Sequence, residues 1–320
     1  MKHFGITTIL AAALSIGNVT AKTFDFNPDL KIGLDAGTTG TGIVLESRIN
    51  GLLGVRTGFD WMPHFEFPMH FNIQVGNDGD PGYDDQGRSR FDRMAGYLED
   101  MTGFRIDQQV DMIGEPHFHN FKLLVDVYPF RNKHWSFTAG FYAGPSVIGR
   151  AYNRTEDMTT LMSVAMYNNI YDKVYDIEYN DESELDGVFL GLELPPLVNQ
   201  KILESGRMGM HVGDFPDGTP YMMEPDQDNM VKAEMKVNSF KPYLGAGFNG
   251  LIDRKNDRLK FAADCGIMFW GGVPKVYTHD GTEITSLNNL NGQVGKYIDI
   301  SNKFKVFPLL NLSISYQIFK

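Results

Sequence analysis

The chain has 320 residues, a formal net charge of −11 and a single cysteine, Cys265. An acidic chain repels the phosphate backbone, so nucleic acid is excluded as a partner. A lone cysteine allows no intramolecular disulfide, although secreted domains that lack a large core usually carry paired cysteines. Interactions other than disulfide bonds must therefore stabilise the fold.

Residues 1–21 have the features of a secretory signal peptide. Lys2 and His3 form a positive start, an apolar run reaches Ile16, and residues 19–21 (Val-Thr-Ala) supply small side chains for a peptidase. The run is shorter than the ~20 apolar residues of a spanning helix. We predict cleavage after Ala21 and one mature domain over 22–320. No comparable apolar run follows, which excludes an α-helical membrane protein.

The last segment of the chain predicts a strand with two unlike faces. From Leu310 to Ile318 apolar residues alternate with Asn311, Ser313, Ser315 and Gln317. A period of two indicates a half-buried strand. Apolar residues on one face and small polar ones on the other are typical of a membrane barrel, with lipid outside and a polar lumen. Ending on such a strand suits a closed sheet, because closure leaves no unpaired edge.

The same alternation recurs in earlier segments and predicts eight antiparallel strands. Asn50-Gly51 is a strong signal for a two-residue hairpin, and Cys265 falls on the lipid-facing side of its strand. The predicted strands cover 30–37, 40–49, 52–62, 119–129, 135–146, 231–249, 259–277 and 305–319.

Connection lengths support this assignment independently. Short turns at 50–51, 131–134 and 251–258 alternate with long segments at 64–117, 147–229 and 279–303. An even strand number puts both termini on the periplasmic side. The fold class is therefore all-β: an eight-stranded antiparallel transmembrane β-barrel with long extracellular loops.

Ionisable residues on the predicted lumenal face occur four of each sign. Buried charges persist only when they are paired, so we interpret them as a salt-bridge network that plugs a narrow barrel. The alternative is a gated polar path for a small solute. The network residues are Glu46, Arg48, Arg56, Asp60, Lys122, Asp126, Lys260 and Asp264.

Catalytic residues are not indicated. A lipid-modifying barrel enzyme needs a His, Ser or acid group near the membrane rim, and His117, His119 and Ser136 are the nearest candidates. The spacing of the two histidines also allows a metal pair. No Gly-x-Ser-x-Gly signature accompanies them, so we predict a non-enzyme without a cofactor.

The long segments carry the acidic excess, because residues 151–230 hold 16 acidic and 4 basic side chains. Divalent cations or a basic partner are conceivable there. We interpret one Asp/Asn cluster as a solvated turn rather than a calcium site, and a methionine group as apolar filler rather than a copper(I) site. These residues are Asn77, Asp78, Asp80, Asp84 and Asp85, and Met208, Met210, His211, Met222, Met223 and Met230.

Several blocks resemble a largely uncharacterised family of small bacterial outer-membrane β-barrel proteins. They are GTTGTGIVLE with LLGVRTGF, then LLVDVYPF, SFTAGFYAG, KPYLGAGF, LKFAADCGIMFWGGVPKV and FPLLNLSISYQIF. The resemblance covers about half of the mature chain. Two departures are Lys320 after the usual terminal aromatic residue, and a longer acidic insertion at 151–216.

The resemblance implies a fold and a location, the Gram-negative outer membrane, and no catalytic motif. The expected partners are outer-membrane lipid and lipopolysaccharide, with the barrel-assembly machinery during insertion. The sequence thus predicts a non-enzymatic barrel with a structural or surface-binding role. A narrow channel or small-solute transporter is the alternative.

Overall fold

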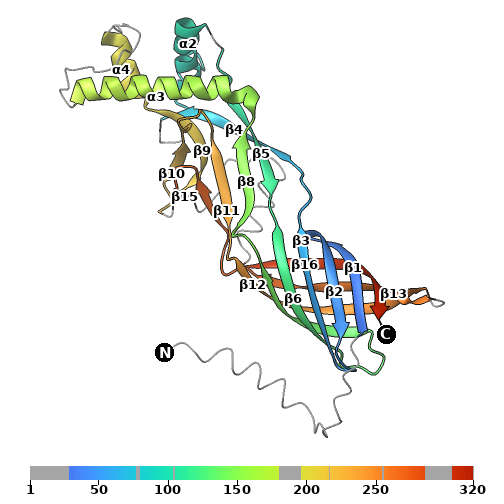
Figure 1. Ribbon diagram of the computed structural model, residues 1–320. Coiled ribbons are helices and arrows are strands. Elements are labelled where there is room, and N and C mark those ends of the chain that lie inside the picture. Colours follow the sequence, from blue (N-terminus) through green and yellow to red (C-terminus); the bar gives the residue numbers. More distant parts are fainter. Residues whose placement is uncertain are drawn as a thin grey trace, which may run out of the picture.

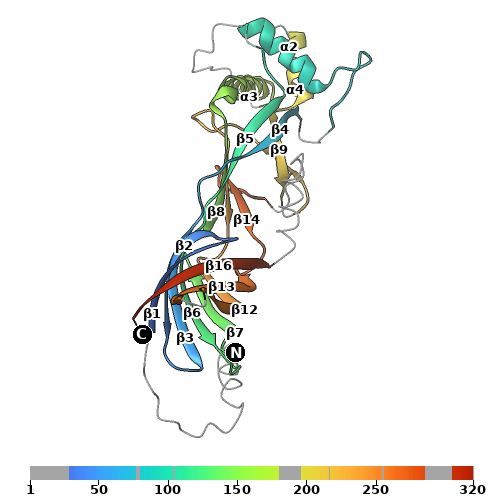
Figure 2. The same ribbon diagram turned by 90° about the vertical axis from the view of Figure 1, so that its right-hand side faces the viewer.

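The structure, a computed structural model, describes residues 29–76, 80–103, 105–179, 196–215, 217–253, 256–284 and 305–319. The predicted signal peptide lies outside these residues. The described chain forms two sheets of eight strands each, one of which is closed. Figures 1 and 2 show the two sheets end to end along the long axis of the molecule.

The closed sheet is the predicted eight-stranded antiparallel barrel. Its order is β1-β16-β13-β12-β7-β6-β3-β2, so the first and last strands are neighbours. Their ladder runs from the Leu30–Phe319 pair to the Gly37–Asn311 pair. The strands are β1 Asp29–Gly37, β2 Gly40–Arg48, β3 Leu53–Trp61, β6 His119–Val127, β7 Trp135–Ala143, β12 Phe240–Asp253, β13 Asn256–Phe269 and β16 Val306–Phe319.

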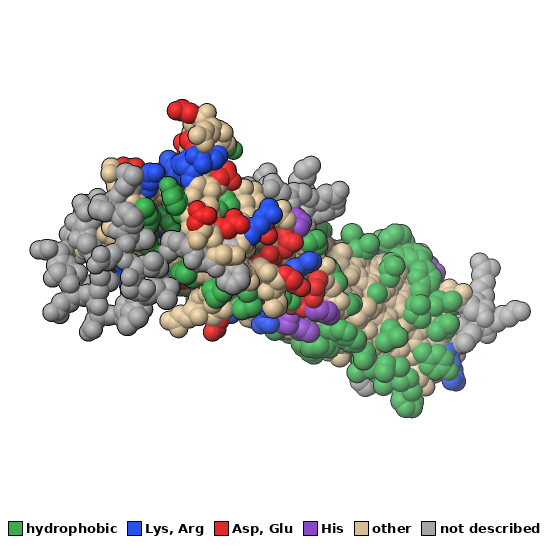
Figure 3. Space-filling model, turned by 90° about the horizontal axis from the view of Figure 1, so that it is seen from above, with side chains coloured by type: hydrophobic (Ala, Val, Ile, Leu, Met, Phe, Trp, Pro, Cys, Tyr) green, Lys and Arg blue, Asp and Glu red, His purple; other side chains and the backbone are tan. Residues whose placement is uncertain are grey.

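Burial follows the predicted alternation around the barrel. On β16, Leu312 and Ile314 are 59% and 57% exposed, whereas Ser313 between them is 5% exposed. Cys265 is exposed on the outer face, as expected. Figure 3 shows the green apolar side chains gathered over the barrel, with charged side chains over the other sheet. The outside of the barrel is thus apolar and its lumen polar.

The three long segments are not loops in their described parts, which corrects the sequence prediction. Six strands from these segments, together with β11 and β14 from two of the predicted barrel strands, form a second antiparallel sheet, ordered β10-β9-β4-β5-β8-β11-β14-β15. These strands are short and interrupted by helices, so their alternation is weak in the sequence. They are β4 Phe67–Val75, β5 Gln109–Pro116, β8 Val147–Asn153, β9 Met208–Asp214, β10 Pro220–Met223, β11 Lys232–Lys236, β14 Lys275–Thr278 and β15 Glu283–Ile284.

Two predicted strands, 231–249 and 259–277, each divide between the two sheets. The first divides into β11 and β12, and the second into β13 and β14. Gly271 and Gly272 have φ of 87° and 150°, a conformation that ends a strand and favours glycine. The Asn238 N–H donates to the Trp270 carbonyl at 3.0 Å, so the two breaks lie side by side. The predicted turn at 251–258 is also shorter, because β12 reaches Asp253 and β13 starts at Asn256.

Helices cover the end of the second sheet that is farthest from the barrel (Figures 1 and 2). They are α2 Arg90–Thr102, α3 Met158–Tyr179 and α4 Pro196–Ser205, with a short 3-10 helix at Thr155–Asp157. Ser89 caps α2, since its hydroxyl accepts from the Asp92 N–H at 3.1 Å and its own N–H donates to the Asp92 carboxylate. Helix and strand side chains such as Leu161, Met94 and Ile73 form one core. None of the described helices is both long and apolar enough to cross a membrane.

We expect Gly271→Ala to destabilise the junction between the sheets more than Gly281→Ala. Both glycines have positive φ, which costs an L-residue about 1–2 kcal/mol. An added Cβ at Gly271 also meets the Asn238 amide at 1.8 Å, whereas at Gly281 it meets nothing within 4 Å. Urea unfolding of the refolded protein measures both losses. Equal losses contradict the close packing at the junction.

Candidate functional site

The barrel lumen contains a first charged cluster centred on Arg56. Its guanidinium lies between two carboxylates, with Nε 2.7 Å from Asp126 and Nη1 2.5 Å from Asp264. Thr138 donates its hydroxyl to Asp126 at 2.6 Å. The three charged side chains are at most 10% exposed. Arg56, Asp126 and Asp264 thus form one buried group.

A second cluster is centred on Lys122. Its ammonium contacts Asp35 and lies 2.6 Å from Asp60, and all three side chains are nearly inaccessible. Thr39 donates to Asp60 at 3.2 Å, and Asn311 donates to Asp35 at 3.2 Å. The sequence analysis did not include Asp35, although its place two residues after Gly33 and four after Lys31 on β1 could have indicated it.

The remaining predicted charges lie toward the end of the barrel that holds the short turns. Lys31 connects Asp29 at 3.3 Å with Glu46 at 4.0 Å. Arg48 lies over the Tyr128 ring, 4.2 Å from its centre. Lys260 is half-buried. Glu46, Arg48 and Lys260 therefore do not join the two clusters around Arg56 and Lys122.

Apolar side chains and a further lysine fill the rest of the lumen. Lys241 is fully buried and donates to Asn120 Oδ1 at 3.1 Å; the sequence analysis missed it, because Pro242 obscured the parity of β12. Between Arg56, Lys122 and the apolar group a cavity of only about 10 Å³ remains, which is about the size of one water molecule. The apolar group comprises Leu124, Tyr142, Tyr243, Met268 and Leu309.

Of the three candidate catalytic residues, the two histidines lie together and Ser136 lies apart from them. His117 and His119 have ring centres 4.4 Å apart at the start of β6. Ser136 is near the start of β7, whose antiparallel pairing with β6 places it at the opposite end of the barrel, where Asn249 donates to it at 3.5 Å. Burial and the neighbouring His119 lower the pKa of His117. The arrangement supplies no nucleophile–base pair.

The suggested ion sites are also accounted for by turns and by core packing. Asp84 accepts from the Gln86 and Arg88 N–H groups at 2.9 Å, as a turn residue does, and Asn77 and Asp78 lie outside the described residues. Met208, Met210 and Met223 are each 1% exposed in the core of the second sheet. Within the described ranges no cluster of His, Cys, Asp and Glu could hold a metal ion.

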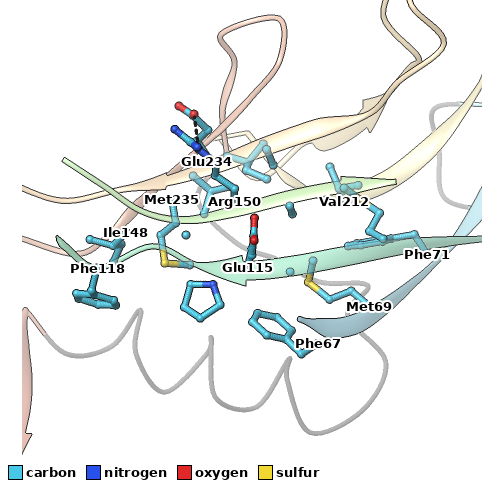
Figure 4. A pocket seen from close by; sticks show the side chains of 18 of the residues that line it. Phe67, Met69, Phe71, Glu115, Phe118, Ile148, Arg150, Val212, Glu234 and Met235 are labelled. Atoms are coloured by element: carbon cyan, nitrogen blue, oxygen red, sulfur yellow. Dashed lines mark ion pairs between the residues drawn. The ribbon is translucent and has the colours of Figure 1, made fainter. Parts of the chain in front are cut away.

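A larger cavity lies within the second sheet. Its volume is about 370 Å³ and its walls are almost entirely apolar (Figure 4). Phe67, Met69 and Phe71 line it from β4, and Met112 lines it from β5. Phe118, Trp270 and Phe307, at the adjoining ends of barrel strands, complete the wall nearest the barrel. The sequence analysis missed this site, because it is assembled from segments treated as loops.

Small residues lie in register on three strands beside this cavity, and at Gly114 the Phe67 ring occupies the place where a side chain would stand. Gly114 pairs with Ala151, and Ala151 pairs with Ala233, so three neighbouring strands carry small residues at one level. The next level, Glu115, Arg150 and Glu234, alternates to the outer face of the sheet. Figure 4 shows Arg150 and Glu234 on the opposite side of the strands from Phe67.

A side-chain hydrogen bond joins the two edges of the second sheet. Tyr221 on the edge strand β10 donates to Asp280, in the turn between β14 and β15, at 2.8 Å. Burial raises the pKa of Asp280, but hydrogen bonds from Thr278, the Thr282 N–H and Tyr221 outweigh it and lower the pKa to about 2. The sheet is thus curled until its first and last strands nearly meet, and the cavity lies inside the curl.

Comparisons with known proteins give distant structural likeness only. No family model and no curated protein matches the chain. Among solved structures, Acinetobacter baumannii CarO2 is similar at 13% identity and a TM-score of 0.37, and CarO at 12% and 0.35; each comparison covers 91% of this chain and 98% of the other. A major outer membrane protein from Thermus thermophilus matches at 13% and 0.29, over 91% and 99%. The closed barrel described here rests on strand pairing.

We expect Arg56→Met to destabilise the barrel by about 3–5 kcal/mol, because Asp126 and Asp264 are left buried without a counter-charge. The triple variant Arg56→Met, Asp126→Asn, Asp264→Asn removes all the charges of the cluster. It should lose less unfolding free energy than Arg56→Met alone. Urea-dependent unfolding from lipid vesicles measures both. A triple variant that is less stable than Arg56→Met contradicts the paired-charge account.

We expect Tyr221→Phe to cost about 1 kcal/mol, the net value of one hydrogen bond, by opening the contact between the sheet edges. The unaltered protein should show a pH dependence of stability that Asp280→Asn lacks, because asparagine does not ionise. Because the folded pKa of Asp280 is below its ordinary value, its contribution is complete above pH about 4 and is lost as the pH falls toward 2. Thermal unfolding of both proteins across this range checks the sign.

Proposed function

We propose that this chain is a non-enzymatic outer-membrane barrel with a plugged lumen, which anchors a folded ligand-binding domain at the cell surface. The observation that carries the proposal is the packed lumen, where Arg56 and Lys122 each lie between two carboxylates. A barrel closed in this way has no evident path for a solute. Its distinctive part is then the second sheet.

The outer face of the barrel supports the membrane location. Large apolar side chains on every barrel strand are exposed, for example Leu34 at 67% and Phe137 at 59%. Soluble proteins rarely expose so continuous an apolar surface, whereas a barrel in lipid requires it. The lumen, in contrast, holds the polar side chains.

The positions of the turns support the orientation. Both described chain ends and the turns after β2, β6 and β12 are at one end of the barrel, and the second sheet extends from the other. Bacterial barrels place short turns and termini in the periplasm. The second sheet and the helices that cover it therefore face outward in the proposed arrangement.

We expect the refolded mature protein to show no single-channel conductance in planar bilayers. A variant with Arg56, Asp60, Lys122 and Asp126 changed to Ala should show openings, because the lumen then loses its cross-links. Four Ala substitutions at the outward-facing Ile43, Phe59, Phe121 and Val125, on the strands β2, β3 and β6, provide the control. Steady conductance of the unaltered protein supports the narrow-channel alternative and overturns the plugged barrel.

We expect Ile314→Lys to destabilise the protein in lipid vesicles by about 2–4 kcal/mol, the cost of a lysine on the lipid face near the bilayer midplane. Ile318→Lys, on the same face near the end of β16, should cost about 0–1 kcal/mol, because it lies close to the interface. Vesicle unfolding titrations compare the two. Equal costs contradict the proposed membrane placement.

A further inference from the structure

We propose that the cavity in the second sheet binds the hydrocarbon chain of one single-chain amphiphile of fatty-acid size. The inference deepens the proposed surface-binding role and rests on it. It names the class of ligand from four features of the cavity: its walls, its volume, the curl of its sheet and its position next to the barrel.

The walls of the cavity offer dispersion contacts and almost no hydrogen bonds. They consist mainly of phenylalanine, methionine, valine and isoleucine side chains from the strands of the second sheet. Methionine is flexible at three bonds and adapts its shape to an irregular chain. The charged residues Glu115, Arg150 and Glu234 belong to the outer side of the strands (Figure 4). A ligand is therefore recognised by its apolar part.

The volume of the cavity fits one hydrocarbon chain. About 370 Å³ is near the lower end of the range of about 300–1,000 Å³ for pockets that hold one small ligand. A lipid with two acyl chains exceeds this space. A hydrocarbon chain in the cavity gains dispersion contacts along its apolar walls.

The curl of the sheet is the type of enclosure that holds one small ligand. Eight antiparallel strands are ordered from β10 to β15, and Tyr221 on the first edge contacts Asp280 beside the last. Eight-stranded barrels are wide enough either to be filled by side chains or to hold one small ligand. In this chain the membrane barrel is filled, whereas the second sheet carries the small residues Ala151 and Ala233 beside the cavity, and Gly114 leaves room for the Phe67 ring that lines it.

The position of the cavity connects it with the barrel surface. Its lower wall contains Phe118, Trp270 and Phe307, which pack together where barrel strands begin or end. An apolar ligand there lies at the level where the barrel leaves the proposed bilayer. A single-chain amphiphile can hold its chain in the cavity while its polar head stays in water.

Trp270 provides a direct test, because it lines the cavity at 4% exposure and the chain has only three tryptophans. The full mature chain with Trp61→Phe and Trp135→Phe is placed in lipid nanodiscs and titrated with a bromine-labelled C16 fatty acid, a contact quencher of indole. We expect saturable quenching of Trp270 at one fatty acid per protein.

Two variants identify where the fatty acid binds. Ala151→Leu fills the cavity and should weaken the binding of the fatty acid at least tenfold. Tyr152→Leu, one residue along β8 and on its outer face, should leave the binding affinity unchanged. A variant in which Trp61, on the outer face of the barrel, is the remaining tryptophan measures the quenching caused by brominated fatty acid dissolved in the lipid. Quenching of Trp61 fluorescence should rise with added fatty acid without saturating. Retained heat-modifiable gel migration shows that each variant is folded.

The results separate this proposal from the plugged-barrel proposal. Unsaturable quenching of Trp270, or equal affinity in Ala151→Leu and the unaltered chain, overturns the cavity as the binding site. Equal quenching by a brominated two-chain lipid overturns the single-chain assignment. Neither result bears on the lumen, which single-channel conductance tests separately.

Discussion

Pairing of β1 with β16 is the constraint on which the rest of the structure depends. This ladder joins the two ends of the described chain and removes the open edge of the sheet. Inside lipid an unpaired strand edge leaves backbone groups without partners, at several kcal/mol for each group. Closure at eight strands then determines the width of the lumen, which is narrow enough for side chains to fill. The paired charges around Arg56 and Lys122 are a consequence of that width, because polar lumenal side chains are buried by closure and need partners.

Closure also explains why the chain builds a second sheet. Barrel strands must end at the membrane surface, but three of the long connections continue as strands beyond it. Gly271 and Gly272 allow the change of direction after β13, and the Asn238–Trp270 contact holds it beside the break before β12. The second sheet lies outside the proposed bilayer and is not constrained by lipid. Its inner face can therefore line a cavity. The same strand number therefore gives a filled lumen in one sheet and an apolar cavity in the other.

Local alternation was sufficient to predict the barrel, because each strand repeats one simple pattern over nine to fourteen residues. The inward direction of Arg56, Asp60, Lys122, Asp126 and Asp264 followed from parity alone. Their partners did not, since a contact such as Arg56–Asp264 joins residues 208 apart in the chain and depends on strand order. The cavity could not be predicted from the sequence for the same reason. Gly114, Ala151 and Ala233 form one level only after β5, β8 and β11 are known to be neighbours.

The distribution of small and large residues indicates that the two sheets have different roles. In the barrel, glycines such as Gly58 and Gly247 lie where an added Cβ meets Lys122 at 3.0 Å or Asp264 at 2.6 Å, so they make room for charged side chains that then fill the lumen. In the second sheet, the small residues at the level of Ala151 adjoin an apolar cavity of about 370 Å³. A chain under selection for stability alone gains by filling such a space, since each buried methylene contributes about 0.8 kcal/mol. The retained space beside a densely packed barrel is the physical reason for the proposal that the second sheet carries the function of this protein.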